Sequence, residues 1–323
     1  MLDIKDKKLL YELDLNARLS IRQLSKKIGL SQEATRYRLG RLQQKRVVLG
    51  FVTYLNFVKL GYFGYAVYCR YSNITEEKKQ ELKSFLKKHE KIYWIAEYGG
   101  RFDLSFSIFA KNPREFDETL TSILSKFSNF LTSTTLITKL EPNKYPRDYL
   151  LEKKRTGHQE KIDQKAYPLT KIEEKILQKL TTNARITAAE IAREINKPLS
   201  TVIYGIKKLE KNNIIGGYTS ILDPTSFGYQ AFQLNIITQN ITEEKIKKIL
   251  AYCEYHPNII LAIKVLGDWN IEIIYEVENA KKMQECIIEL RNNFSDIIKD
   301  IELLNFFEDY IKLNHYPFKI SQK

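Results

Sequence analysis

Apolar residues follow two different spacings that alternate in blocks along the chain. In residues 1–60 they recur every three or four positions, as in Leu9, Leu10 and Leu13, and this period is typical of short helices with one buried face. From Tyr65 onward, stretches in which every second residue is apolar alternate with further helical stretches. The pattern predicts an α+β protein in which a helical domain precedes a mixed domain.

Three short helices are expected in residues 1–60. Ser20 and Gln23 have the spacing of a capping box, which opens the second helix. Gly29 can turn without a Cβ penalty, and Ser31 can cap the third helix. A helix, a tight turn and a capped helix make a helix-turn-helix. The apolar segment 47–54 follows and predicts a short β wing.

The next stretch predicts a strand, a helix, two strands, a helix and a strand, near residues 65–69, 82–86, 92–98, 104–108, 116–127 and 132–140. This order, βαββαβ, is the ferredoxin-like arrangement.

The second half of the chain repeats the first. Asn16 aligns with Asn183, a shift of 167 positions, and the six residues 73–78 recur letter for letter at 240–245. A repeat of this length is a duplicated module, not a solenoid of short units. We therefore expect a winged helix-turn-helix and a ferredoxin-like βαββαβ domain, each present twice, with the boundaries 1–60, 61–150, a linker 151–167, 168–227 and 228–317.

The charge is unevenly distributed. The chain carries 52 Lys and Arg against 39 Asp and Glu, a net charge of +13. Residues 1–155 hold 30 basic and 17 acidic side chains, whereas residues 156–323 hold 22 of each. The whole excess lies in the first copy, and it indicates a polyanionic partner such as nucleic acid or anionic lipid.

Other chemistry has little support in the sequence. The three cysteines lack metal-ligand spacing, and the four histidines are scattered without a partner carboxylate, so we expect no metal, no cofactor and no catalytic group. The first residues are too charged for a signal peptide, and no apolar run approaches the ~20 residues that span a bilayer. We expect a cytoplasmic protein without a membrane partner.

The third predicted helix carries the candidate DNA-reading residues. Polar side chains flank its apolar set, and an arginine fork can bond guanine or a phosphate with two hydrogen bonds. Residues 1–60 have 13 basic and 5 acidic side chains, although a basic helix face can also be merely solvated. We expect double-stranded DNA to contact Gln32, Glu33, Arg36, Tyr37, Arg38 and Arg41.

The second copy departs from this pattern. Residues 168–227 have 9 basic and 6 acidic side chains. Pro198 replaces Ser31, Ile203 replaces Arg36 and Gly205 replaces Arg38, while Lys207, Lys208 and Lys211 can still reach phosphate. The hypothesis is that the first copy reads sequence and the second binds DNA weakly or not at all. Arg18, repeated as Arg185, fits either a structural contact or a phosphate contact.

The ordered motifs resemble a known family. They are Leu2–Leu10, Asn16–Ser20, Ile28–Ser31, Arg38–Leu42 and Gly100–Asp103, and together they resemble the Lrp/AsnC (feast/famine) transcriptional regulators over nearly the whole chain, twice. The resemblance implies DNA binding by the helix-turn-helix, an αβ domain of the RAM type, and pairing of the two αβ domains as an intrachain pseudo-dimer. Two such chains are then able to associate into a homo-oligomer. An amino acid effector is often bound between αβ domains.

The resemblance also implies an effector site at the turn of Gly100 and Asp103, where backbone N–H groups receive a carboxylate and the aspartate pairs with an ammonium. The alternative is structural, because a β hairpin needs glycine and aspartate for positive φ and local hydrogen bonds. In the second copy Asn270 replaces the aspartate, which makes an effector there doubtful.

A second function shares this architecture. Siroheme decarboxylases have the same helix-turn-helix plus αβ organisation, and we expect them to carry a His and a Tyr-Asn pattern at these turns. This chain has Arg101, Phe102, Asp268 and Trp269 there. The DNA-binding regulator is therefore the expected function and the enzyme the alternative.

Overall fold

The computed structural model describes residues 2–153, 166–240 and 242–311, which form two compact units. The helical unit contains the described parts of 1–62 and 161–227, and the barrel unit contains those of 63–160 and 228–311. Within these ranges no helix combines the length and the apolar character that a bilayer crossing requires.

The helical unit contains two helix-turn-helix modules. In the first, Ser20 forms the predicted capping box with Gln23, Gly29 adopts a φ of 67°, and the Ser31 side chain accepts a hydrogen bond from the Ala34 N–H. The three predicted helices are thus confirmed. The elements are α1 (Ile4–Leu15), α2 (Ile21–Ile28), α3 (Gln32–Gln44), β1 (Val48–Leu55) and η1 (Val58–Leu60), then α6 (Lys171–Thr182), α7 (Ala188–Glu194), α8 (Leu199–Lys211), β6 (Ile215–Leu222) and η3 (Pro224–Phe227).

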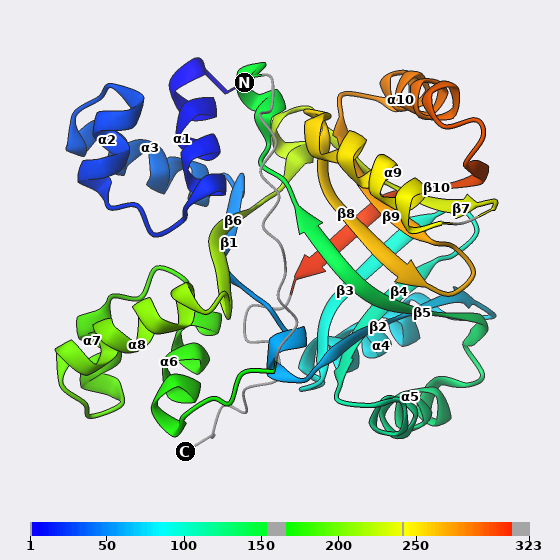
Figure 1. Cartoon of the computed structure of the whole chain (residues 1–323), viewed down its shortest axis with the longest axis horizontal. Helices are drawn as coiled ribbons and strands as arrows, with labels where there is room; N and C mark the ends of the chain where they lie inside the picture. Colours follow the sequence, from blue (N-terminus) through cyan, green and yellow to red (C-terminus); the bar gives the residue numbers. More distant parts are fainter. Residues whose placement is uncertain (1, 154–165, 241, 312–323) are drawn as a thin grey trace. The chain divides into compact units, whose positions relative to one another are not determined.

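The segment predicted as a wing joins the two modules. β1 pairs with β6 in an antiparallel two-stranded ribbon, with Val52 opposite Thr219. The ribbon runs between the helices of the first copy and those of the second (Figure 1). The Thr53 hydroxyl donates to the Leu180 carbonyl of the other copy at 2.7 Å. The partner of each strand is therefore the other copy's strand, which the periodicity of one copy alone does not reveal.

The barrel unit contains the βαββαβ order twice, as predicted. In the first copy the elements are β2 (Phe63–Tyr71), α4 (Glu76–Lys88), β3 (Ile92–Gly99), β4 (Leu104–Ala110), α5 (Pro113–Phe127), β5 (Leu131–Lys144) and η2 (Asp148–Leu151). In the second copy they are β7 (Gln230–Thr238), α9 (Glu243–Tyr255), β8 (Ile259–Leu266), β9 (Ile271–Val277), α10 (Ala280–Asn293) and β10 (Ile298–Ile311).

The two sheets close into one eight-stranded barrel. Each copy has the ferredoxin-like strand order, β5-β2-β4-β3 and β10-β7-β9-β8, and the seams are the antiparallel pairs β5–β8 and β10–β3. The helices α4 and α5 cover one side of the barrel, and α9 and α10 cover the opposite side (Figure 1). The sheet faces turned away from the helices bury a shared core that includes Tyr68, Tyr98, Phe102, Trp269 and Leu304.

The hydrogen-bonding side chains inside the barrel occupy different positions in the two copies. Gln233 accepts a hydrogen bond from the Tyr98 hydroxyl at 2.9 Å and donates one to the Tyr68 oxygen at 2.9 Å. The Tyr68 hydroxyl donates to Glu272 at 2.8 Å. Burial, followed by the nearby Glu272 charge, raises the pKa of Tyr68 well above its ordinary value. The equivalent positions in the opposite copies are Ala66 for Gln233 and Ser105 for Glu272, so the network requires one copy of each kind.

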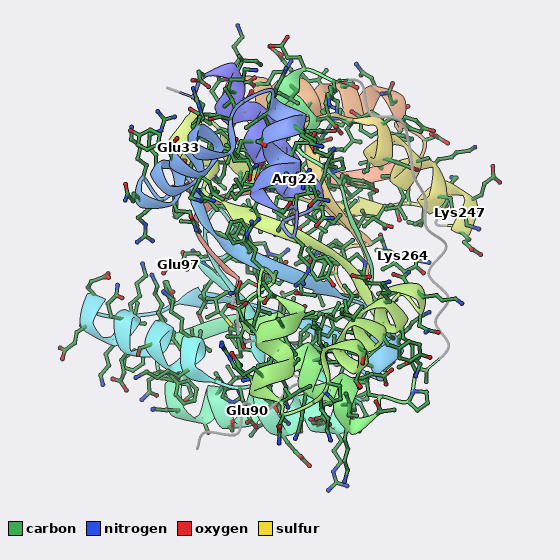
Figure 2. The ribbon with its side chains drawn as sticks, turned by 90° about the vertical axis from the view of Figure 1, so that its left-hand side faces the viewer. Arg22, Glu33, Glu90, Glu97, Lys247 and Lys264 are labelled. Carbon is green, nitrogen blue, oxygen red and sulfur yellow. The ribbon has the colours of Figure 1, made fainter. Side chains whose placement is uncertain are left out.

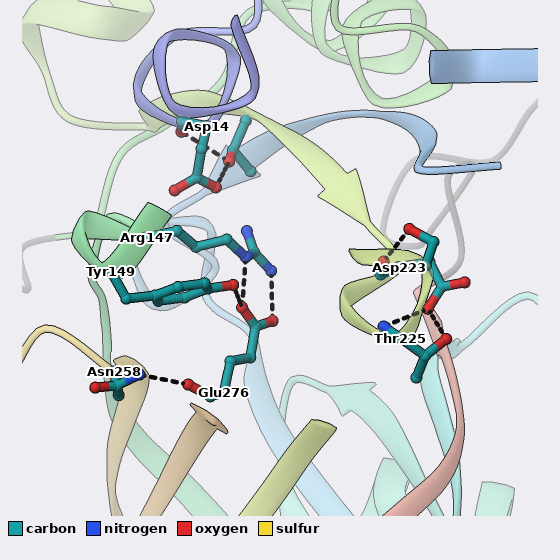
Figure 3. A network of polar contacts seen from close by, with 9 residues as sticks. Asp14, Arg147, Tyr149, Asp223, Thr225, Asn258 and Glu276 are labelled. Carbon is teal, nitrogen blue, oxygen red and sulfur yellow. Dashed lines mark hydrogen bonds and ion pairs between the residues drawn. The ribbon is translucent and has the colours of Figure 1, made fainter. Parts of the chain in front are cut away.

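The end of the first copy packs on the second. The Tyr145 N–H donates to the Ile260 carbonyl, and the Tyr145 ring joins the core of the second copy. Arg147 donates two hydrogen bonds to Glu276, at 2.8 and 2.9 Å, and Tyr149 donates to the same carboxylate (Figure 3). Most of the predicted linker, 154–165, and the end of the last predicted domain, 312–317, lie outside the described residues.

The buried Arg147–Glu276 pair generates a stability prediction. We expect Arg147→Ala to lower the free energy of unfolding by about 3–5 kcal/mol, because it leaves the Glu276 carboxylate buried without its cation. Both tryptophans, Trp94 and Trp269, lie in the barrel unit, so urea unfolding followed by tryptophan fluorescence reports on this unit.

The matched control is Arg114→Ala. Arg114 forms an exposed pair with Glu118 on α5, and its loss should change the unfolding free energy by less than about 1 kcal/mol. Equal effects of the two substitutions would contradict the structural role of Arg147.

Candidate nucleic-acid interface

The polar residues of α3 divide into two groups. Gln32, Glu33, Arg36 and Tyr37 are exposed, and the Tyr37 side chain reaches 71% exposure. The opposite face of the helix is buried against the module through Thr35, Leu39 and Leu42. Figure 2 labels Glu33 on this helix and Arg22 on α2. The exposed group provides donors and acceptors of the kind that read base edges in a major groove.

Arg38 and Arg41 point back toward α1. Arg38 Nη1 lies 2.7 Å from Asp3 Oδ2 and 2.8 Å from Asp6 Oδ1, and Arg41 pairs with the other oxygen of Asp6. The Asp6 side chain is only 2% exposed. The hydrogen bonds to Asp3 and Asp6 raise the pKa of Arg38, and the Asp6 N–H and Arg38 lower the pKa of Asp3. These ion pairs hold α3 on α1, so DNA contact by Arg38 or Arg41 stays a prediction.

The second copy repeats this contact in reduced form. Lys208, at the position of Arg41, pairs with Glu173, at the position of Asp6, across 3.0 Å. At the position of Arg38, a Cβ on Gly205 would lie 2.6 Å from Ile176 Cδ1. The mid-helix glycine therefore allows α8 to pack closely on α6, and Lys208 is engaged in the contact between helices.

Arg18 and Arg185 connect the two modules reciprocally. Each guanidinium donates to backbone carbonyls of the other copy, and each lies over an aromatic ring there, Arg18 at 5.0 Å from the Tyr218 centroid and Arg185 at 5.1 Å from that of Phe51. Burial and then the Arg18 charge lower the pKa of Arg185. The acceptors are Ala184 and Ile186 for Arg18, and Ala17 and Leu19 for Arg185. The structural alternative for these arginines is therefore the one the contacts support.

The first two turns of α8 expose an apolar strip to solvent, which the sequence reasoning did not single out. Leu199 and Ile203 are 46% and 39% exposed and stand where α3 has Gln32 and Arg36. Tyr204 matches Tyr37 and is 68% exposed. Pro198 precedes the helix and provides no side-chain cap. The spacing of Leu199 and Ile203, four residues apart and off the buried stripe, was the available signal.

Gly100 and Asp103 belong to a turn with the same geometry in both copies. Asp103 Oδ2 accepts a hydrogen bond from the Tyr71 N–H at 2.8 Å, and Asn270 Oδ1 accepts one from the Thr238 N–H at 2.9 Å. The aspartate and the asparagine thus perform the same backbone capping. Their difference in charge does not alter it.

The glycines of these turns lie against a strand of the opposite copy. Gly100 has a φ of 134°, and a Cβ there would lie 3.2 Å from the Leu303 carbonyl oxygen. Gly267 has a φ of 155°, and its Cβ would lie 2.9 Å from that of Leu136. Both glycines are accounted for by the barrel seams, since a side chain at either position meets backbone.

The shared role of Asp103 and Asn270 predicts that charge is dispensable at this turn. We expect Asp103→Asn to leave the free energy of unfolding within about 0.5 kcal/mol of the parent, and Asp103→Ala to lower it by about 1–3 kcal/mol because the Tyr71 N–H loses its acceptor. Tryptophan fluorescence in a urea titration measures both. Equal losses for Asn and Ala would show that the carboxylate charge, not the acceptor oxygen, stabilises the turn.

Both helical modules match known helix-turn-helix domains. The AsnC-type helix-turn-helix domain matches residues 2–43, and a winged helix-turn-helix DNA-binding domain matches residues 169–215. An uncharacterized HTH-type transcriptional regulator of Pyrococcus horikoshii is 30% identical over 147 residues, 46% of this chain and 82% of the relative. The proline dehydrogenase transcriptional activator of Rhizobium radiobacter is 28% identical over 138 residues, 42% and 88% of the two chains.

A solved structure matches both copies at once. The crystal structure of the siroheme decarboxylase NirDL, in complex with an iron-uroporphyrin III analogue, has a TM-score of 0.60 over 98% of this chain and 95% of its own, at 11% identity. At that identity the likeness concerns the fold alone. The matched regulators each cover less than half of this chain, in agreement with a duplicated module. The chain belongs to the Lrp/AsnC family of helix-turn-helix transcriptional regulators, with the family's module present twice.

Proposed function

We propose that the protein regulates transcription by binding double-stranded DNA at a specific sequence, with α3 in the major groove. The observation that carries the proposal is the exposed group of Gln32, Glu33, Arg36 and Tyr37 on a helix that follows a capped turn. The net charge of +8 in residues 1–60, from 13 basic and 5 acidic side chains, supplies the attraction to phosphate. A regulator of this kind acts where the DNA lies, which agrees with the expected cytoplasmic location.

The two modules contribute unequally to this binding. Arg36 has a side chain able to form two hydrogen bonds with guanine, whereas Ile203 at the matching position has no donor. Arg38 and Arg41 support α3 from behind through Asp3 and Asp6. We therefore assign base-edge hydrogen bonding to α3. Exposed Lys207 and Lys211 of α8 are assigned to phosphate.

An amino acid effector at the turn of Gly100 and Asp103 is the second part of the proposal. One solved transcriptional regulator, from Neisseria meningitidis, is a complex with the amino acid L-methionine. In this chain the Asp103 carboxylate caps the Tyr71 N–H and has intermediate exposure, so its charge remains accessible to an ammonium group. Association of two chains into a homo-oligomer is likewise proposed.

The enzymatic alternative has weaker support. Phe102 and Trp269, at the two turns, are each 1% exposed and pack against Tyr68, with ring centroids 5.3 and 5.0 Å apart. Neither turn carries a histidine in the sequence. The matched relatives are named transcriptional regulators, and the siroheme decarboxylase shares the fold. A Soret absorbance change on adding siroheme to the full chain would support the enzyme.

Arg36→Ala tests the reading role of α3. We expect it to reduce the preference for a site selected from a random duplex pool by about 1–3 kcal/mol, while binding to unrelated DNA changes little. The control is Lys207→Ala, which should weaken specific and unrelated DNA alike. Competition binding at two salt concentrations separates the two effects. If both substitutions cost the same specificity, the division of roles between α3 and α8 is wrong.

Asp103→Asn tests the effector, because the amide keeps the acceptor oxygen and removes the charge. The parent protein is titrated by isothermal calorimetry with each of the twenty amino acids, and we expect at least one of them to bind with measurable heat. The variant should bind that amino acid at least about tenfold more weakly, because it loses one charge-assisted hydrogen bond. Heat that is unchanged in the variant would remove Asp103 from the site. No heat with any amino acid would remove the amino acid effector.

A further inference from the structure

Three large apolar side chains of α8, those of Leu199, Ile203 and Tyr204, are exposed to water and form what we call the apolar face of α8. Their exposure indicates that a partner covers this face. Leu199 and Ile203 lie one turn apart, and Tyr204 follows directly. All three are exposed, while Val202, Ile206 and Leu209 already provide the buried stripe that packs on the module. The packing of the fold therefore does not explain Leu199 and Ile203.

The surroundings of this face are basic. Lys197, Lys207 and Lys211 are exposed around it, and Arg193 is exposed on α7. The nearby acidic side chains are engaged elsewhere. Glu194 pairs with Lys179 at 2.7 Å, Glu210 accepts a hydrogen bond from Tyr218 at 2.8 Å, and Glu190 forms the capping box of α7. An apolar strip between cations fits a polyanion that has apolar groups within a groove.

Duplex DNA has such a groove. The thymine C5-methyl group is the apolar feature of the major groove, and apolar side chains contact it, whereas guanine and adenine edges require donors and acceptors. α8 occupies the same place in its module as α3 does in the first, and the helical unit holds both modules through the β1–β6 ribbon and the two arginines. Each module of the helical unit therefore has a helix at the position of a recognition helix.

We propose that α8 reads thymine methyl groups through Leu199 and Ile203, so that the recognised DNA is an asymmetric site with a hydrogen-bonded half under α3 and a thymine-rich half under α8. This inference rests on the proposed function and revises the expectation that the second copy binds DNA weakly or not at all. Tyr37 and Tyr204 contribute alike to both halves. The difference between the halves is carried by the pairs Gln32/Leu199 and Arg36/Ile203.

The reading of methyl groups is tested by replacing thymidine with deoxyuridine in the DNA. Uracil lacks only the C5-methyl group of thymine and keeps its hydrogen-bonding pattern. The full chain is used to select a site from a random duplex pool. The half whose base preference is lost with Arg36→Ala is assigned to α3, and the other half to α8. We expect uracil in the α8 half to weaken binding by about fourfold per contacted methyl. Uracil in the α3 half should have a smaller effect.

The double variant Leu199→Gln, Ile203→Arg gives α8 the residue types that α3 has at the equivalent positions, Gln32 and Arg36. Both substituted positions are exposed to solvent. We expect the double variant to abolish the effect of uracil in the α8 half and to shift the base preference of that half away from thymine. The Arg36→Ala variant should retain the uracil effect in the α8 half. Far-ultraviolet circular dichroism and the thermal unfolding midpoint check that the double variant folds. A second variant, Ile203→Val, keeps an apolar contact and should retain most of the uracil effect.

The outcomes separate this inference from the proposed function. If no site is selected and all duplexes bind alike, the proposed function fails. If a site is selected but uracil in the α8 half binds as thymine does, the reading of methyl groups is overturned while sequence-specific binding by α3 stands. If the double variant changes the sedimentation of the free protein and leaves DNA preference unchanged, the α8 face is a contact between chains, and the inference is overturned.

Discussion

A four-stranded sheet covered by helices on one face leaves its other face and two of its edges in need of a partner. In this protein the partner is the second copy of the same sheet. The pairs β5–β8 and β10–β3 close both edges, and the two bare faces bury one another around Tyr68, Tyr98 and Trp269. A single βαββαβ domain would expose this apolar surface and these unpaired strand edges to water. The duplicated chain satisfies both requirements within one molecule.

The positions that maintain the pairing are those that both copies keep. Arg18 and Arg185 donate to each other's module, and Gly100 and Gly267 let a strand of the opposite copy pass close by. At two positions where the residue types differ, the contact persists. Asp103 and Asn270 cap equivalent backbone N–H groups, and Arg41–Asp6 becomes Lys208–Glu173. At the turn an acceptor oxygen is enough, because its partner is a backbone N–H, whereas the contact between helices keeps a cation opposite a carboxylate in both copies.

Covalent connection frees other positions to diverge, since each copy always meets the other and never itself. The barrel interior uses this freedom. Gln233 and Glu272 of the second copy bond to tyrosines of the first, and a pair of identical copies would lack one side of each bond. On the exposed faces of the helix-turn-helix modules the same freedom gives α3 Gln32 and Arg36 where α8 has Leu199 and Ile203. A homodimer imposes two-fold symmetry on its operator, whereas this chain does not require it.

The sequence by itself determined the element types, the duplication and the helix-turn-helix, because capping residues, glycine turns and hydrophobic periods are local signals. It also placed Gln32, Glu33, Arg36 and Tyr37, to which we assign base reading, on one helix, and all four are exposed. Tertiary structure decided what each element meets. Only the fold shows that β1 pairs with β6, that Asp3 and Asp6 hold Arg38 and Arg41, and that Gly205 makes room for Ile176. These contacts join residues far apart in the sequence, and the spacing within one copy carries no record of which surface of the other copy lies against it.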